Sequence, residues 1–543
     1  MANTSNDLKH ALSIVHSSDL KYPDDQLLEC FLQDSIDPGA AAHYMLQRCS
    51  AGRDTLDLGQ FLADWKQLVI SFTDEMSPHP RPERDIVADV KKRDGGKCCI
   101  TGLQSSLFDP LIVAPILPAR TVEKSLHDIL GVFVGSEMQQ RLLASDALLN
   151  GHRNHWLVRK SAAVALSRGY FQFRFTKGSD YRVAKVPIGV STWPSIVDKM
   201  SMLRPGRLVD HSASGIDIPD VSLLRVVSRF AKPMRWASIG REIASRQPPP
   251  ASSMPASSFW HLFSEHATVA FINLCRLIPA ALRIRLYRFL GFMGAHLYGS
   301  TSSLKVQRLP FGMYLKTTSS EDSAALVNEY GALQLVRRRT HVPVPRPLDL
   351  VSSGSASYLL TSRLPGHRLG MCIDSLSEGE VNTLVGDLRT CLIDLRAIPK
   401  QVAPNYAISN TLGGPCYDFR LITGLEYDKE RGDFIGPFAD EGAFNKALQI
   451  GALPGVSHST GHEIVFTHGD LNMRNVLVHD GRLSGIVDWE NSGWFPDYWE
   501  YTKAHFVTKL QKRWLRIVDD VFTHFSDFKS ELATERQFWE YCC

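Results

Sequence analysis

Cysteine is scarce and unpatterned in this 543-residue sequence, which holds ten of them. None stands in a C-x-x-C pair, so neither a zinc ribbon nor a disulfide framework is indicated, and reduced thiols are expected. An excess of either charge is also lacking, because 60 lysines and arginines face 57 acidic residues, a net charge of +3. This balance gives no overall basic field of the kind that attracts nucleic acids.

Long apolar runs are missing as well. The N-terminus lacks the apolar core and cleavage site of a signal peptide. The most apolar stretch, Ala267 to Leu282, is interrupted by Arg276 and Pro279. It falls short of the ~20 apolar residues that a membrane span needs, so we interpret it as a buried or interfacial helix. These absences predict a cytoplasmic protein, with the nucleus as the alternative.

The composition that remains is globular, with 44% hydrophobic and 22% charged residues. A chain of this length predicts about three or four compact units. Apolar residues recur at helical spacing before residue 85, whereas Gln247–Ser258 holds four prolines and four serines in twelve residues, a linker composition. The expected organisation is a helical segment at 1–85, a small α/β domain at 86–185, a partly flexible linker at 186–260, amphipathic helices at 261–299, a strand-rich part at 300–365 and a helix-rich part at 366–543.

Basic residues mark the helical stretch before residue 300. Arg276, Arg283, Arg285 and Arg288 lie at or near helical spacing there. A basic amphipathic helix can contact membranes or acidic partners. The alternative, which we favour from the sequence, is a helix that packs on the following domain with its arginines facing water.

The pattern richest in chemistry is FTHGDLNMRNVLVHDGRLSGIVDWE at residues 466–490. Asp470 and Asn475 lie on one loop, and two short strands joined by a turn then lead to Asp488. Because a hairpin returns the chain to its start, we expect Asp488 to lie beside Asn475 and Asp470. Asp and Asn oxygens suit Mg²⁺, and a carboxylate free of metal can deprotonate a hydroxyl group. These are the requirements of phosphoryl transfer.

In these residues the sequence resembles the aminoglycoside phosphotransferase-like branch of the protein-kinase-like superfamily, over about residues 285–525. His468-Gly469-Asp470, Asn475 and Asp488-Trp489-Glu490 match the H-G-D-x-x-x-x-N and D-x-E pattern of that branch. The resemblance implies an α+β, two-lobed fold with a strand-rich N-lobe and a helical C-lobe. It also implies that Asp470 is the catalytic base and that Asn475 and Asp488 hold the metal. Segments such as NTLGGPCYDFRL and GWFPDYWEY resemble fungal members of the family.

An upstream pair agrees with this resemblance. Lys316 ends the apolar strand GMYL, and Glu329 follows thirteen residues later on an expected helix, with Glu321 as the rival glutamate. In kinase-like folds a strand lysine grips the phosphates of ATP and a helix glutamate holds that lysine. The family resemblance also implies that adenine meets the backbone near Thr361 to Arg363.

Two departures from protein kinases narrow the function. No G-x-G-x-x-G precedes Lys316, and the nearby turn offers only Gly299 and Gly312. A helix beginning at Pro496 leaves no room for an activation loop after Asp488. We therefore predict an ATP- and Mg²⁺-dependent phosphotransferase acting on a hydroxyl group of a small molecule. The alternatives are a kinase-fold binding or scaffold protein with little turnover, and a nucleic-acid enzyme.

Residues 86–175 resemble a fungal HNH-endonuclease-like domain in RDGGKCCITG, VAPILP and NHWLVRKSAAVALSRGYFQFRF. That motif needs one histidine as general base and another as metal ligand beside an asparagine. Pro115 stands where the first histidine is expected, and Ala163, nine residues after Asn154, stands where the second is expected. Proline and alanine can neither take a proton nor bind a metal, so a degenerate domain retained as a scaffold is predicted.

Overall fold

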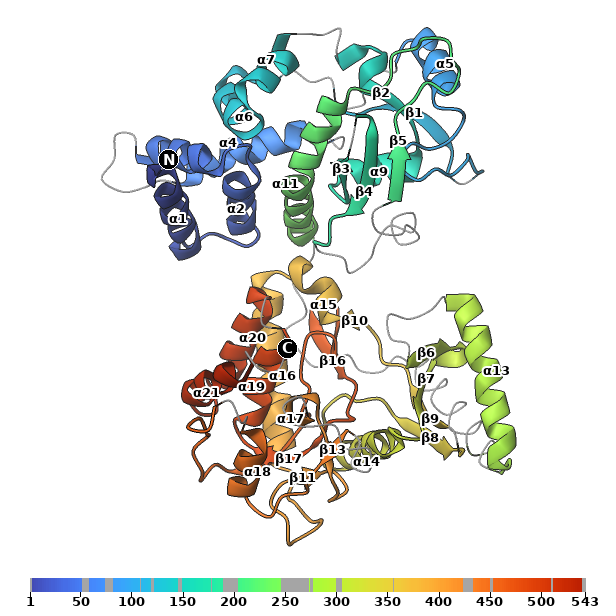
Figure 1. The fold of residues 1–543 in the computed structure, drawn as a ribbon, viewed down its shortest axis with the longest axis vertical. Helices are drawn as coiled ribbons and strands as arrows, with labels where there is room; N and C mark the ends of the chain where they lie inside the picture. Colours follow the sequence, from blue (N-terminus) through green and yellow to red (C-terminus); the bar gives the residue numbers. More distant parts are fainter. Residues whose placement is uncertain are drawn as a thin grey trace. The chain divides into compact units, whose positions relative to one another are not determined.

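The computed structural model describes residues 2–50, 58–73, 82–107, 109–118, 122–144, 149–176, 178–188, 204–245, 273, 277–298, 305–354, 356–422, 433–449, 453–508 and 511–539. The chain divides into two compact units, Met1–Gln247 and Pro248–Cys543 (Figure 1). The division falls at the start of the proline- and serine-rich stretch from which a linker is expected. Most of the apolar stretch at 267–282 lies outside the described residues.

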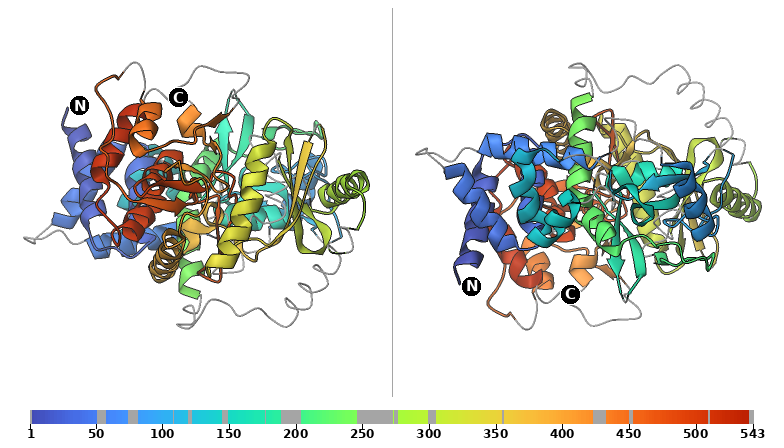
Figure 2. Two further views of the ribbon diagram at one scale, coloured as in Figure 1. Left: turned by 90° about the horizontal axis from the view of Figure 1, so that it is seen from below. Right: turned by 90° about the horizontal axis from the view of Figure 1, so that it is seen from above.

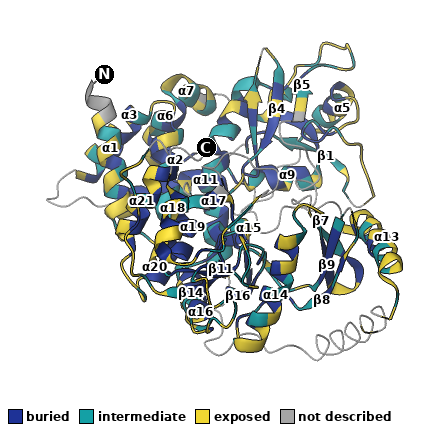
Figure 3. Cartoon of the chain, turned by 60° about the horizontal axis from the view of Figure 1, so that its bottom comes forward, coloured by how far each residue is buried: buried dark blue, intermediate teal, exposed yellow. Residues whose placement is uncertain are grey.

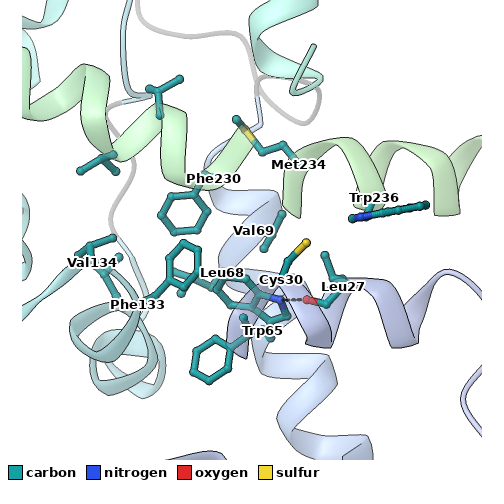
Figure 4. Packing of buried hydrophobic residues seen from close by; sticks show 14 of the residues in the cluster. Leu27, Cys30, Trp65, Leu68, Val69, Phe133, Val134, Phe230, Met234 and Trp236 are labelled. Atoms are coloured by element: carbon teal, nitrogen blue, oxygen red, sulfur yellow. Dashed lines mark hydrogen bonds between the residues drawn. The ribbon is translucent and has the colours of Figure 1, made fainter. Parts of the chain in front are cut away.

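Helices make up most of the first unit, and each long one buries an apolar stripe. They are α1 (Ala2–Ser17), α2 (Asp24–Asp34), α3 (Pro38–Ser50), α4 (Leu58–Ser71), α5 (Arg84–Arg93), α6 (His127–Val134), α7 (Ser136–Ala144), α9 (Lys160–Ser167) and α11 (Val221–Ser245). Trp65 lies at the centre of their core, where its Nε1 donates a hydrogen bond to Leu27 O at 2.9 Å. The ring of Phe31 contacts it edge-on. The rings of Phe133 and Phe230 also lie against it (Figure 4).

The strands of this unit form two small antiparallel sheets. β1 (Leu111–Pro115) pairs with β2 (His155–Arg159), and α9 follows β2 directly. The second sheet has the order β3-β4-β5, from Phe171–Phe175, Asp180–Lys185 and Arg204–Arg207. Pro115 ends β1 opposite His155, so the position where the resemblance expects a histidine stands at a strand end.

The segment 186–260 differs from the linker that the sequence predicts. Within it, α11 packs Phe230, Met234 and Trp236 into the core of the first unit (Figure 4). The hydrophobic periodicity of α11 is obscured because a charged residue, Arg235, is also buried. The guanidinium of Arg235 lies 4.3 Å from the centroid of the Tyr170 ring. A buried arginine among apolar residues hides the stripe from which a helix is inferred.

The second unit begins with a four-stranded antiparallel sheet of order β6-β7-β9-β8. Its elements are α13 (Ala280–Tyr298), β6 (Val306–Leu309), β7 (Met313–Ser319), α14 (Ser323–Arg339), β8 (Pro347–Ser352) and β9 (Ala356–Ser362). β8 is absent from the sequence prediction because prolines crowd its start, but Pro347 is its first residue and β8 is an edge strand, where proline is tolerated.

The two helices lie on opposite faces of this sheet (Figures 1 and 2). Successive side chains of a strand point to opposite faces. Met313 and Leu315 therefore pack with Tyr287 of α13, whereas Lys316 points to the other face and reaches Glu329 of α14. This alternation aims the lysine at the rest of the unit.

Beyond residue 366 the chain carries helices and more strands than the single hairpin that the sequence predicts. The helices are α15 (Leu369–Cys372), α16 (Glu378–Arg396), α17 (Phe419–Ile422), α18 (Glu441–Leu448), α19 (Trp499–Val507), α20 (Lys512–Phe522) and α21 (Lys529–Trp539). The strands are β10 (His367–Arg368), β11 (Ser409–Asn410), β12 (Cys416–Tyr417), β13 (Phe434–Ile435), β14 (Ile464–Thr467), β15 (Val476–His479), β16 (Arg482–Ile486) and β17 (Gly493–Pro496). Strands of two to five residues are too short to show a clear alternation.

These strands form three small sheets, of orders β10-β15-β16, β11-β17-β14 and β12-β13. The apolar core of this unit contains several buried tryptophans, among them Trp489, Trp494 and Trp499. None of the described helices combines the length and the apolar content that crossing a bilayer requires.

Candidate active site

Lys316 is the hub of a buried cluster of charges. Its Nζ lies 2.7 Å from Glu329 Oε2 and 2.8 Å from Glu490 Oε2, and it also pairs with Asp488. The sequence predicts Lys316 with Glu329. It leaves Glu490 without a role, although the D-x-E pattern contains that residue.

One ammonium cannot neutralise three carboxylates. Burial by itself would lower the pKa of Lys316, but Asp488, Glu329 and Glu490 raise it well above its usual value. Burial raises the pKa of Glu329, whereas Lys316 holds the pKa of Asp488 below its usual range against the effect of burial. The cluster therefore carries an excess of negative charge, which a bound cation would offset.

The loop after β14 carries Asp470. Asn475 Nδ2 donates to Asp470 Oδ2 and to Asp470 O, both at 2.9 Å, and Asn472 Nδ2 also donates to Asp470 O at 2.9 Å. Burial raises the pKa of Asp470 to about 6. Its carboxylate is thus held in one orientation by the loop that presents it.

The hairpin β15–β16 brings Asn475 and Asp488 together, as its length predicts. Val476 faces Ile486 in the register, and Val487 N donates to Asn475 O at 2.9 Å. Asp488 follows with a φ of 70°, a left-handed conformation that Asp tolerates better than most residues. The predicted juxtaposition is therefore present in the backbone itself.

Glu500, on α19, holds the backbone of the loop that carries Asp470. This buried carboxylate accepts hydrogen bonds from the backbone amides of His468, Gly469 and Leu471 at 2.6, 3.2 and 3.2 Å. Gly469 has a φ of 78°, and a Cβ at this position would lie 2.4 Å from Asn491 O, so only glycine fits. No sequence signal identifies Glu500, because it lies some thirty residues from the amides it binds.

Lys503 is a further charge that the sequence analysis does not identify. It lies one turn after Glu500 on α19, and its buried Nζ is 2.6 Å from Asp418 Oδ1. Burial is the main influence on the pKa of Asp470, and Lys503 opposes it. A buried ammonium therefore acts on the carboxylate of Asp470.

The turn between β6 and β7 replaces a glycine-rich loop. Phe311 and Gly312 both adopt a positive φ there, of 63° and 69°. Gly312 O accepts a hydrogen bond from Arg363 N at 2.8 Å, and Arg346 O accepts one from Ser362 N at 3.0 Å. Two of the three amides from which an adenine contact is expected are therefore already engaged.

The oxygen donors of this charge cluster and of Asn475 fit a divalent cation. Oxygens of Glu329, Asp488 and Glu490 lie within 4.8 Å of one another. Asn475 uses its amide nitrogen on Asp470, which leaves Oδ1 without a hydrogen bond among the described residues. Carboxylate and amide oxygens are ligands that Mg²⁺ accepts. Asn475 and Asp488, with Glu490 close by, are the residues that would hold it.

The candidate site of the first unit has a different character. Pro115 and Ala163 line one cavity of about 50 Å³, together with apolar residues such as Trp156 and Phe230. Buried Asn154 donates to Leu117 O and Leu149 O, both at 2.7 Å, and accepts from Leu117 N at 2.9 Å. Asn154 thus holds the local backbone, and the HNH-like resemblance stays a prediction.

The comparisons with known proteins concern the second unit. Residues 306–522, which include every residue of the charge cluster and the Asp470 loop, match the phosphotransferase enzyme family. No curated protein matches the chain. The matched region is therefore similar to domains of the phosphotransferase enzyme family.

Solved structures of aminoglycoside phosphotransferases are similar to part of the chain. APH(4)-Ia has 16% sequence identity over 45% of this chain and 81% of its own, with a TM-score of 0.30. APH(3'')-Id from Streptomyces rimosus has 15% identity over 44% of this chain and 87% of its own, with a TM-score of 0.30. A GDP complex of an aminoglycoside 2'-phosphotransferase-IIIa mutant has 15% identity over 47% and 87%, with a TM-score of 0.32.

Proposed function

We propose that the second unit transfers the terminal phosphoryl group of ATP to a hydroxyl group of a small molecule, with Mg²⁺ as cofactor. The observation that carries this proposal is the convergence of Lys316 and Glu329 with Asp488, next to the loop that joins Asp470 to Asn475. Phosphoryl transfer depends on positioning and on neutralised charge, and these residues supply both.

Each residue has a distinct role in this proposal. Lys316, held by Glu329, grips the phosphates of the nucleotide. Asn475 and Asp488 hold the metal, which when bound neutralises charge on the phosphate oxygens. Asp470 accepts the proton of the attacking hydroxyl group, and its orientation by Asn475 Nδ2 at 2.9 Å supports that role.

The short connection after Asp488 supports a small acceptor rather than a protein. Only β17 separates Asp488 from α19, and the whole connection is described. A protein kinase needs an activation loop in this place. The acceptor is therefore a hydroxyl-bearing small molecule whose structure an activity screen must supply.

The decisive experiment combines an ADP-release screen over hydroxyl-bearing metabolites and antibiotics with the variant Asp470→Asn. The variant is nearly isosteric, so it should keep MgATP binding while slowing transfer by ~10²–10⁴-fold, the range for a lost general base. Binding is measured by calorimetry on the same preparations. Equal, slow ATP turnover by wild type and variant across the screen would favour the scaffold alternative.

A further inference from the structure

The outward side of α13 carries exposed apolar side chains in addition to the exposed arginines that the sequence predicts, Arg285 and Arg288. α13 packs on the sheet through Tyr287 and Leu290. Two of its arginines bond to side chains of the sheet. Arg283 pairs with Asp349, and Arg288 Nε donates to Tyr358 Oη at 2.9 Å. The helix thus buries Tyr287 and Leu290 against the sheet and leaves Phe289 and Phe292 exposed.

One row of side chains occupies that outward side. The outer face, as we name it, consists of Leu282, Arg285, Phe289, Phe292 and His296, spaced by three and four residues. Residues at this spacing share one side of a helix. The exposed fractions of Leu282, Phe289 and Phe292 are 51, 58 and 66%. The outer side of α13 is coloured mostly as exposed in Figure 3.

Acidic residues are absent from the chain around this helix. From His266 to Ser320 the sequence contains no aspartate or glutamate, but it contains the basic residues Arg276, Arg283, Arg285, Arg288, Lys305, Arg308 and Lys316. The whole chain, by contrast, has nearly equal numbers of the two charges. Arg285, on the outer face itself, has no ion-pair partner among the described residues. Arg283, Lys305 and Lys316 pair with carboxylates of the second unit, so the positive charge on the outward side of α13 comes from the exposed Arg285 and Arg288. This charge is complementary to an anionic surface.

We propose that the outer face of α13 binds the surface of anionic membranes, with Phe289 and Phe292 entering the boundary between headgroups and acyl chains and Arg285 contacting lipid phosphate or carboxylate groups. Helices of this kind lie in the interface with aromatic and aliphatic residues inward and basic residues beside them. This inference is independent of the phosphotransferase proposal.

A second copy of the chain fits the face less well. Pairing two outer faces would bring the two Arg285 side chains into one interface without an acidic residue to balance them. The row also spans only two heptads, whereas a coiled coil needs about three or four. An acidic protein would satisfy Arg285, but a convex row of two phenylalanines and a leucine offers no pocket for one.

The test is co-sedimentation of the full chain with vesicles of phosphatidylcholine alone or mixed with phosphatidylserine. Wild type should bind only the mixed vesicles. Phe289→Ser with Phe292→Ser, and separately Arg285→Glu, should each lower the partition coefficient about tenfold or more, because each removes one of the two contributions. These side chains are exposed, so the variants should fold, which circular dichroism checks.

Matched controls carry the same changes elsewhere on the surface. Leu107→Ser alters a side chain that is 90% exposed in the first unit, and Lys529→Glu reverses a charge whose side chain is 82% exposed. Both should bind like wild type. Binding that ignores phosphatidylserine, or that survives in the double serine variant, would overturn the proposal. A wild-type dimer in light scattering that the double serine variant abolishes, without vesicle binding, would assign the face to a second copy.

Discussion

The two units differ in the side chains that they place at the positions of their sequence motifs. In the first unit Pro115 and Ala163 line an apolar cavity, and Asn154 is engaged in hydrogen bonds to the backbone. In the second, Lys316 stays buried among three carboxylates. Buried charges are costly unless they are paired, so a cluster with surplus charge indicates a functional demand. The comparison shows that the second unit retains buried charge at its motif positions, whereas the first unit has apolar residues at the corresponding positions of its own motif.

The largest expected effect lies in the second unit. Asp488→Asn keeps the left-handed backbone but removes the charge that we propose holds the metal, so turnover should fall by roughly 10³-fold or more. The rise in melting temperature with MgATP should lose its Mg²⁺-dependent part, measured against EDTA. Asp480→Asn is the matched control, since Asp480 also has a positive φ and its side chain is 85% exposed in the same hairpin. An unchanged Mg²⁺ effect in Asp488→Asn would remove this residue from the metal site.

The next effect is on the stability of the first unit. Phe230→Ala deletes a fully buried ring of α11 that stacks 4.1 Å from Phe72, so it should lower the free energy of unfolding by about 3–5 kcal/mol. Denaturant titration of the full chain measures the change. Ser245→Ala, exposed at the end of the same helix, should cost less than about 0.5 kcal/mol. A small effect of Phe230→Ala would return α11 to the status of a linker.

A smaller, pH-dependent effect distinguishes the charged core of the second unit from the apolar first unit. Burial would raise the pKa of Glu535, but hydrogen bonds from His458 and Arg420 hold it below its usual value. The carboxyl group of Glu535 therefore has a lower pKa in the folded protein than in the unfolded chain. Its charge stabilises the fold at a pH above the unfolded-state pKa, and this stabilisation is lost as the pH falls through the folded-state pKa.

Glu535→Gln should therefore flatten the acid side of the thermal-stability profile and cost roughly 1–3 kcal/mol at neutral pH, since a hydrogen bond to the charge is lost. Thermal unfolding of the full chain over a pH series measures both. Exposed Glu463→Gln should leave the profile unchanged. An equally steep acid side in Glu535→Gln would show that other carboxyl groups govern it.

The last prediction is that the first unit has no nuclease activity. Without both motif histidines, the full chain should show no DNA cleavage stimulated by Mg²⁺ or Mn²⁺. His152→Ala should change nothing, because His152 Nε2 is engaged 3.0 Å from Asp89 Oδ2. Any DNA binding should be weak and steeply salt-dependent. Nicking that survives repurification and disappears in His152→Ala would mean that the first unit is a nuclease after all.

Much of the candidate site could be predicted because its residues are close in sequence. Asp470, Asn475 and Asp488 lie on one loop and one hairpin, and the length of the hairpin dictates their meeting. Strand alternation predicts the direction of Lys316, and the resemblance to kinase-like folds implies its pairing with Glu329. Their roles in catalysis remain predictions, whereas their proximity is now a geometric fact.

Local pattern thus determined the strand that aims Lys316, the hairpin that joins Asn475 to Asp488, and the proline-rich boundary between the units. Only the tertiary structure decided which distant charged residues join the site: Glu500, which binds the amides of the loop, and Lys503, which pairs with Asp418. It also decided that α11 is buried in the first unit. Periodicity reports which residues share a face of one element, but a partner from another element leaves no trace in it. The orientation of α13 belongs to the same class, because Asp349 and Tyr358, far along the chain, determine which side of that helix meets the solvent.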